Sequence, residues 1–164
     1  MAGYATDLTL KIKVLPLNSR NALPIASAPE AQITTSSRAW KPYPPGNVKL
    51  NGYSYDAWPA ATSGDVTLTW SHRSRREQGA GGQLVAQDTA GSYTLEGTLK
   101  LEVLIAGTVK RTWTGLTGTS QVYTAAQRAA DDADETKSVQ FRITPVNGTL
   151  NGNARTTPAF VMSA

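Results

Sequence analysis

Short stretches in which apolar and polar residues alternate recur from residue 47 to the end of the chain. The clearest is DVTLTWS, residues 65–71, in which Val66, Leu68 and Trp70 share one face and Thr67 and Thr69 the other. A period of two is typical of a β-strand with one buried face. Comparable stretches are VKLNGYSY (48–55), LKLEVLIAG (99–107), TVKRTWTGL (108–116), SQVYT (120–124), SVQFRITPV (138–146) and a last strand within 155–162. The pattern predicts six or seven short antiparallel strands.

Turn signals separate these stretches, and Asn147-Gly148 is the clearest of them. The charged fraction is only 17% and the chain has no cysteine, so neither a disulfide framework nor a thiolate metal site is available. Trp70 on an early strand and Phe141 on a late one are the expected core signature. We therefore expect an all-β fold, a fibronectin type III or immunoglobulin-like β-sandwich with one short helix.

The expected helix lies in YTAAQRAADDADE, residues 123–135, which is rich in alanine. Thr124 is a candidate N-cap, and Gln127 follows at the spacing of a capping box. The acidic residues at the end oppose the helix dipole. We expect two turns at most.

The N-terminal part differs from the rest of the chain. In LTLKIKVL, residues 8–15, one face of a strand carries Leu8, Leu10, Ile12 and Val14. Residues 16–46 hold six of the nine prolines and read as an extended connector. We expect an N-terminal arm, 1–40, and a sandwich with a Pro-rich lead-in, 41–164. A lone strand cannot bury its own apolar face. We therefore expect the strand of the arm to belong to a small subdomain or to a sheet that another chain completes.

Composition excludes several classes of partner. The net charge is +4, but the basic residues are scattered, which disfavours a nucleic-acid binder. No apolar run approaches the ~20 residues that cross a bilayer, and the N-terminus lacks the shape of a signal peptide. We expect a soluble protein with no membrane insertion and no export signal.

The stretch LTWSHRSRREQ, residues 68–78, concentrates charge after Trp70. If the strand continues, parity points Arg73 and Arg75 outward and leaves His72 at the margin of the core. Arg76 adds a third cation. Three interpretations are open: a solvated strand end, an interface with carboxylates of a neighbouring chain, or a contact with nucleic acid or an anionic glycan.

Catalytic and metal chemistry find little support in the sequence. His72 is the single histidine, Ser71 and Ser74 do not form a G-x-S-x-G elbow, and Glu96 and Glu102 have no local cause for a raised pKa. The acidic run at 131–135 lacks the spacing of an EF-hand loop. We expect no catalytic site, no metal site and no cofactor.

Aromatic residues gather around the connector and the first strand. Two interpretations are open: the rings pack the connector onto the sandwich, or they form a platform for a sugar or a subunit. The residues are Trp40, Tyr43, Tyr53, Tyr55 and Trp58.

Three motifs in order carry a narrower resemblance: PYPPGNVKLNG (42–52), GDVTLTWSHRSRREQ (64–78) and RTWTGLTGTSQVYTAAQRAAD (111–131). Together they resemble the C-terminal fibronectin type III-like region of tail-tip hub proteins of long-tailed bacteriophages and gene transfer agents. The Trp-x-x-Arg-x-Arg signature of that family corresponds to Trp70, Arg73 and Arg75. Family members are longer and carry ring-forming domains that precede this region. In the family, the loop after the Arg signature often carries a Pro-Glu pair, whereas in this sequence Glu96 has no proline partner.

The resemblance implies a hub-associated structural module of a virion tail tip or baseplate, which serves subunit assembly and host attachment and is assembled in the cytoplasm of the bacterial host. It implies a trimeric arrangement and, as partners, other tail-tip proteins such as the hub and the central fibre, with a host surface glycan or protein as a further partner. The alternative is a carbohydrate-binding module that recognises the host cell surface. The candidate subunit interface comprises Leu8, Leu10, Ile12, Val14, Trp40, Tyr43, Arg73, Arg75 and Arg76.

Overall fold

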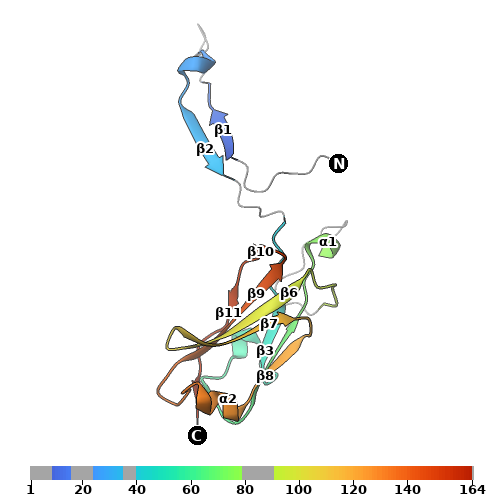
Figure 1. The fold of residues 1–164 in the computed structure, drawn as a ribbon, viewed down its shortest axis with the longest axis vertical. Helices are drawn as coiled ribbons and strands as arrows, with labels where there is room; N and C mark the ends of the chain where they lie inside the picture. Colours follow the sequence, from blue (N-terminus) through green and yellow to red (C-terminus); the bar gives the residue numbers. More distant parts are fainter. Residues whose placement is uncertain (1–8, 16–23, 35–39, 79–90, 164) are drawn as a thin grey trace. The chain divides into compact units, whose positions relative to one another are not determined.

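The computed structural model describes residues 9–15, 24–34, 40–78 and 91–163 (Figure 1). The chain divides into two compact units, Met1–Trp40 and Lys41–Ala164. Each unit is described by itself.

The first unit contains a β-hairpin. Strand β1 (Thr9–Lys13) pairs antiparallel with β2 (Glu30–Thr34), so that Leu10 lies opposite Ile33 and Ile12 opposite Ala31. A short 3-10 helix, η1 (Ile25–Ser27), precedes β2. The expectation of a lone strand followed by an extended connector is therefore wrong at residues 30–34. Strand β2 has only five residues and its apolar positions are Ala31 and Ile33, too weak a pattern to be recognised before its partner is known.

The second unit contains two main antiparallel sheets. The smaller has the order β3-β5-β8, and the larger has the order β10-β9-β6-β7, with β11 also pairing with β9. Their bounds are β3 (Gly46–Leu50), β5 (Val66–Ser71), β6 (Thr98–Ile105), β7 (Thr108–Leu116), β8 (Ser120–Tyr123), β9 (Val139–Asn147), β10 (Leu150–Asn151) and β11 (Arg155–Thr156). A parallel pair joins β4 (Ala61–Thr62) to β12 (Val161–Met162).

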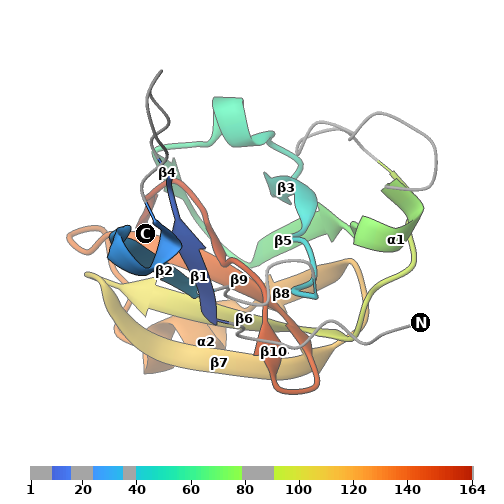
Figure 2. The same cartoon turned by 90° about the horizontal axis from the view of Figure 1, so that it is seen from above.

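This strand order is that of a fibronectin type III or immunoglobulin-like sandwich, and the predicted fold class is confirmed. Seen from above in Figure 2, β3 and β5 form a layer separate from β6 and β7. The first predicted strand, 48–55, is wrong at its end: the chain turns after Leu50 at Asn51 and Gly52, which both have positive φ, and continues into the 3-10 helix η2 (Tyr55–Ala57). The last predicted strand divides into β11 and β12.

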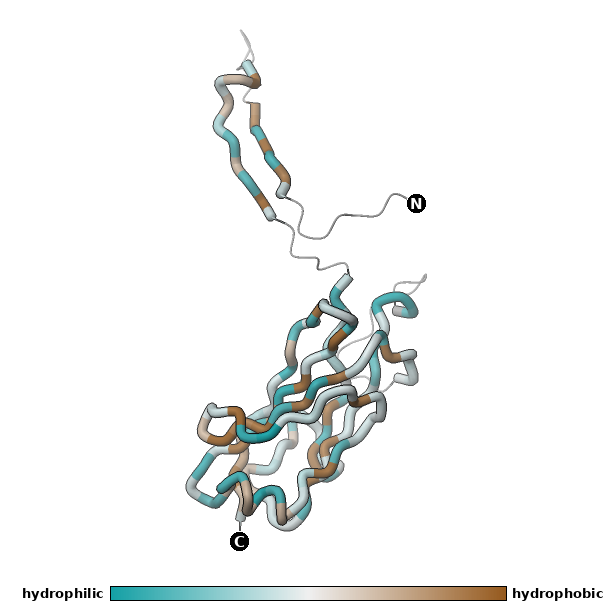
Figure 3. Tube along the Cα trace, viewed as in Figure 1, coloured by the Kyte–Doolittle hydropathy of each residue, from teal (hydrophilic) through white to brown (hydrophobic). Residues whose placement is uncertain are grey.

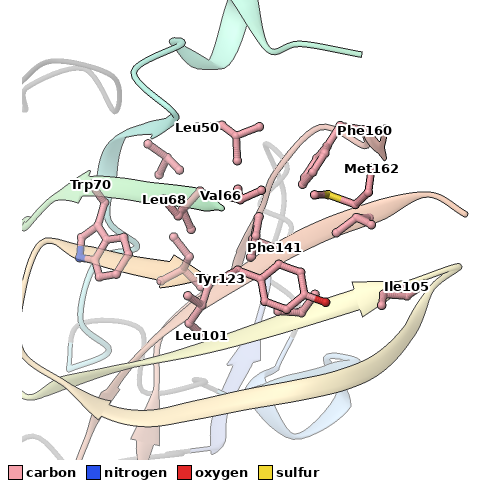
Figure 4. Packing of buried hydrophobic residues seen from close by; sticks show 14 of the residues in the cluster. Leu50, Val66, Leu68, Trp70, Leu101, Ile105, Tyr123, Phe141, Phe160 and Met162 are labelled. Carbon is pink, nitrogen blue, oxygen red and sulfur yellow. The ribbon is translucent and has the colours of Figure 1, made fainter. Parts of the chain in front are cut away.

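The core lies between the two layers and follows the predicted alternation. Val66, Leu68 and Trp70 are at most 3% exposed. Phe141 meets Tyr123 edge-on and stacks on Phe160, with ring centroids 6.0 and 5.9 Å apart (Figure 4). Both members of the core signature, Trp70 and Phe141, are buried as expected.

Two short helices complete the unit. Helix α2 (Ala125–Ala130) carries the predicted capping box: Thr124 Oγ1 accepts from Gln127 N at 3.2 Å, and Thr124 N donates to Gln127 Oε1 at 3.0 Å. Helix α1 (Arg75–Gln78) follows β5 and was not predicted. Within the described residues, no helix has the length and apolar character needed to span a membrane.

Candidate functional site

The hairpin of the first unit exposes an apolar face. Leu10, Ile12 and Ile33 are 43, 41 and 53% exposed, and with Ala31 they form one side of the ribbon, which we call the hairpin apolar face. Figure 3 shows the alternation of hydrophilic and hydrophobic positions along β1. Val14 lies just beyond β1 and is 76% exposed, whereas Leu8 lies outside the described residues.

The opposite face of the hairpin is polar and satisfied within the unit. Lys11 Nζ lies 3.0 Å from Glu30 Oε1, and Thr9 and Thr34 share a hydrogen bond of 3.2 Å. Lys13 Nζ donates to Ile25 O at 3.0 Å. One face of the ribbon therefore has its polar partners, while the other leaves branched apolar side chains accessible to solvent.

The Arg-rich stretch does not continue the strand. Strand β5 ends at Ser71 and α1 begins at Arg75. The alternation of a strand therefore does not determine the directions of Arg73 and Arg75, and the expectation based on it is wrong. The chain is held at this point by Gly118 O, which accepts from Trp70 Nε1 at 3.1 Å and lies 3.1 Å from His72 Nε2. Figure 2 shows α1 just beyond the end of β5.

Glu96 organises the start of α1. Its Oε1 accepts from Arg75 N at 2.6 Å and from Ser74 Oγ at 3.4 Å, while Oε2 accepts from Arg75 Nε at 2.8 Å. The side chains of Arg75 and Glu96 are only 17 and 8% exposed. This pair joins segments 21 residues apart, and local sequence offers no signal for it.

A second carboxylate strengthens the same junction. Glu77 Oε2 accepts from Thr94 N at 3.0 Å, and hydrogen bonds from the Thr94 hydroxyl and amide hold the pKa of Glu77 below its ordinary value. Helix α1 is therefore tied to residues 94–96 through two charged side chains.

The three arginines thus have different environments. Arg73 lies over the ring of Tyr43, with Cζ 5.2 Å from the ring centroid, and Arg75 is engaged with Glu96. Arg76 is exposed and makes no hydrogen bond or ion pair with any other described residue. It lines a pocket of about 350 Å³ together with Thr94, Leu95 and Asn147.

The aromatic residues of the second unit are used mainly for packing. Tyr55 Oη donates to Thr156 O at 2.8 Å, and the guanidinium of Arg155 lies 4.5 Å from its ring centroid. Trp58 packs against Tyr55 and Phe160. Tyr53 is an exception at 55% exposed, and Trp40, at 39%, belongs to the first unit. The packing interpretation accounts for Tyr43, Tyr55 and Trp58, and no described observation favours a sugar platform.

One titratable cluster joins β7, β8 and the end of α2. Asp131 accepts from Arg111 Nε and Nη2 at 2.7 and 2.9 Å and from Tyr123 Oη at 3.1 Å. Burial, followed by the charge of Asp131, raises the pKa of Tyr123, so the phenol stays protonated and donates. The bidentate pair and the phenol hydrogen bond join β7 and β8 to the residue that follows α2.

A second cluster lies on β6 and β9. Glu102 accepts from Arg142 Nε at 2.8 Å and from Lys100 Nζ at 3.1 Å, and the Arg142 hydrogen bond holds the pKa of Glu102 below its ordinary value. A general acid at neutral pH needs a raised carboxyl pKa instead. In the part of the chain that the structure describes, no group of three or more His, Asp or Glu side chains is arranged to hold a metal ion.

Comparisons with known proteins give structural similarity alone. No family model matches the chain, and no curated protein matches it. The crystal structure of domains d3–d4 of the rat CD45 extracellular region is similar at 12% identity and a TM-score of 0.41, covering 97% of this chain and 67% of that one. Domains A168–A170 of titin are similar at 15% identity and a TM-score of 0.39, covering 82% and 37%. The fold assignment rests on the strand order and not on these similarities.

Proposed function

We propose that the protein is a structural component of a long-tailed bacteriophage tail tip or baseplate, in which the hairpin apolar face docks on another tail-tip subunit. The observation that carries the proposal is the amphipathic hairpin, with a satisfied polar side and an accessible apolar side. The proposed assembly is suggested by the three ordered motifs that resemble tail-tip hub proteins. That resemblance also suggests the hub or the central fibre as partner and a trimeric arrangement. The role is assembly rather than chemistry.

The hairpin suits addition to an open-edged sheet of the partner. An isolated two-stranded hairpin is marginally stable in water, so covering the apolar face stabilises it. Full burial of a Leu or Ile side chain contributes about 1.5–3 kcal/mol, and Leu10, Ile12 and Ile33 are about half covered already, so on the order of 2–5 kcal/mol is available. Main-chain hydrogen bonds along a strand edge add affinity, and the alternating side chains define the register.

Arg76 is the arginine of the candidate interface with an available guanidinium. Arg75 is engaged with Glu96, and Arg73 packs on Tyr43, so both support the fold of the second unit. Arg76 can pair with a carboxylate of a neighbouring subunit in bidentate geometry. Its contribution is to specificity and orientation, whereas the hairpin contributes most of the affinity.

The test is incorporation into particles. In the bacterial cells that produce the particles, the protein is supplied as wild type, as the truncation that lacks residues 1–40, or as the double variant Leu10→Asn, Ile12→Asn. Purified particles are then assayed for the protein by immunoblot. Both altered proteins are expected to be depleted from particles at least about tenfold, the ratio that corresponds to ~1.4 kcal/mol of lost binding free energy.

The matched control changes the polar side of the same ribbon. Thr9→Asn, Gln32→Asn also introduces two asparagines into the hairpin, and normal incorporation is expected. Circular dichroism of the isolated truncated protein should retain the strand signal of the sandwich. Normal incorporation of the truncated protein or of the apolar-face variant would overturn the proposal.

A further inference from the structure

The chain contains three Asn-Gly pairs: Asn51-Gly52, Asn147-Gly148 and Asn151-Gly152. Because glycine has no side chain, its backbone nitrogen can approach the side-chain amide carbon of the preceding asparagine. The three pairs share this local chemistry, so a difference in their reactivity has to come from the fold. Each pair offers two atoms that the fold can protect, the asparagine Cγ and the glycine nitrogen.

The Asn51 side chain is held at both ends. Its Oδ1 accepts from Thr67 N at 2.7 Å, and its Nδ2 donates to Thr62 Oγ1 at 3.2 Å. Presenting Cγ to the Gly52 nitrogen would break both hydrogen bonds at once, one of them to the main chain of β5.

At Asn151 the fold protects the nucleophile instead. Gly152 N donates to Pro145 O at 2.8 Å. The Gly152 backbone is also packed so closely that an added Cβ would collide with Pro42 O. The Gly152 nitrogen is therefore engaged in a main-chain hydrogen bond, and the glycine lies in close contact with Pro42 and Pro145.

Neither protection applies at Asn147. Among the described residues, the side-chain amide of Asn147 has no hydrogen-bond partner, and the backbone N–H of Gly148 has none either. Gly148 and Thr149 are exposed at the tip of the β9–β10 hairpin. The main chain of Asn147 packs against Gly97, where an added Cβ would come within 3.0 Å of Asn147 Cα, but this contact holds neither the Asn147 side chain nor the Gly148 nitrogen. The approach of these two groups is opposed by the pairing of the two-residue strand β10, and short pairings at a hairpin tip open at low free energy.

We propose that Asn147 is a site of spontaneous deamidation in the native protein, and that the fold protects Asn51 and Asn151. The deprotonated Gly148 nitrogen attacks Asn147 Cγ, forming an N–Cγ bond, and Nδ2 leaves as ammonia with protons supplied by water. Water then adds to one of the two carbonyls of the resulting succinimide ring and breaks a ring C–N bond. The products are aspartate and isoaspartate, with no change of oxidation state.

The modification changes both charge and backbone at one edge of the pocket that Arg76 lines. Aspartate replaces the Asn147 amide with a carboxylate in that pocket. Isoaspartate adds a methylene to the main chain at the end of β9, which shifts the register opposite Leu150. Aged protein is therefore expected to carry an added negative charge at position 147, and its isoaspartate fraction is expected to have an altered β10 pairing.

The experiment uses the full chain, incubated at mildly alkaline pH in native buffer and, in parallel, in concentrated guanidinium chloride. Peptide mapping by mass spectrometry follows the conversion of amide to carboxyl at each site. Trypsin leaves Asn147 and Asn151 on one peptide, 143–155, so fragment ions assign the site. In the native protein Asn147 is expected to react at least about tenfold faster than the other two, the ratio of a difference of ~1.4 kcal/mol.

In guanidinium chloride the three rates should converge to within a few-fold, because only local sequence then matters. Asn147→Gln should abolish the native conversion in peptide 143–155, whereas Asn151→Gln should leave it unchanged. Equal native rates, or a lead of Asn51 or Asn151, would refute the proposal. So would an equally large lead of Asn147 in the unfolded chain, since sequence would then set the order.

Discussion

Ala106 has the least favourable backbone conformation for its residue type among the described residues. The β6–β7 hairpin closes through Ala106 and Gly107, with φ of +47° and +79°. Positive φ at both central positions is the geometry of a type I′ turn, for which Asn-Gly is preferred. An alanine in this region costs about 1–2 kcal/mol. The sequence predicts a turn between the two strands but gives no sign of the strain at Ala106.

Replacing Ala106 with asparagine should stabilise the second unit. Ala106→Asn is expected to raise the free energy of unfolding by about 0.5–1 kcal/mol, because asparagine tolerates the left-handed region. Guanidinium denaturation of freshly prepared protein measures the change. Ala154→Asn, at an exposed loop position without positive φ, is the control. A lower denaturation midpoint for Ala106→Asn would contradict this account of the turn.

At the scale of elements, helix α2 shows local sequence and tertiary contacts acting together. The capping box of Thr124 and Gln127 is encoded within four residues. Two further contacts come from elsewhere: Ala125 N donates to Asp65 Oδ1 at 2.8 Å, and Arg128 donates to Gly64 O at 3.3 Å. Hairpin strand β2 is the opposite case, because it is defined only by pairing with β1.

Removal of the cap should weaken α2 measurably. Thr124→Ala loses the side-chain acceptor for Gln127 N and is expected to lower the free energy of unfolding by about 1 kcal/mol. Thr124→Ser keeps a hydroxyl and should retain most of the stability. Thermal or chemical denaturation gives the comparison, and equal stability of the alanine and serine variants would rule out a stabilising role for the cap.

At the scale of the whole molecule, charged pairs on the sheets make stability depend on pH. Glu102 has a folded pKa below its ordinary value of 4.5, chiefly because Arg142 donates a hydrogen bond to it. A depressed pKa contributes stability that is present above the unfolded pKa and is lost as pH falls through the folded one. This stabilisation is therefore complete at neutral pH and declines below pH 4.5.

The expected consequence is a smaller acid effect when Glu102 is neutral at all pH values. The free energy of unfolding of Glu102→Gln should fall less than that of wild type between neutral pH and the region below 4.5. Glu135→Gln, an exposed substitution, should follow the wild-type curve. Parallel curves for wild type and Glu102→Gln would show that the Arg142 pair makes no contribution in this pH window.

The alternating strands, the buried Trp70 and Phe141, the capping box and the class of sandwich can all be predicted from the linear sequence. These follow from local periodicity and hydrogen bonds between near neighbours, which a linear pattern records. Tertiary structure alone decided the pairing of β2, the Glu96 contacts with Arg75 and the differing protection of three identical Asn-Gly pairs. Each of these depends on a partner that lies far away in sequence, or on how tightly the surrounding backbone packs. The stretch after Trp70 therefore holds its own fold together through Arg73 and Arg75, and leaves Arg76 exposed beside a pocket.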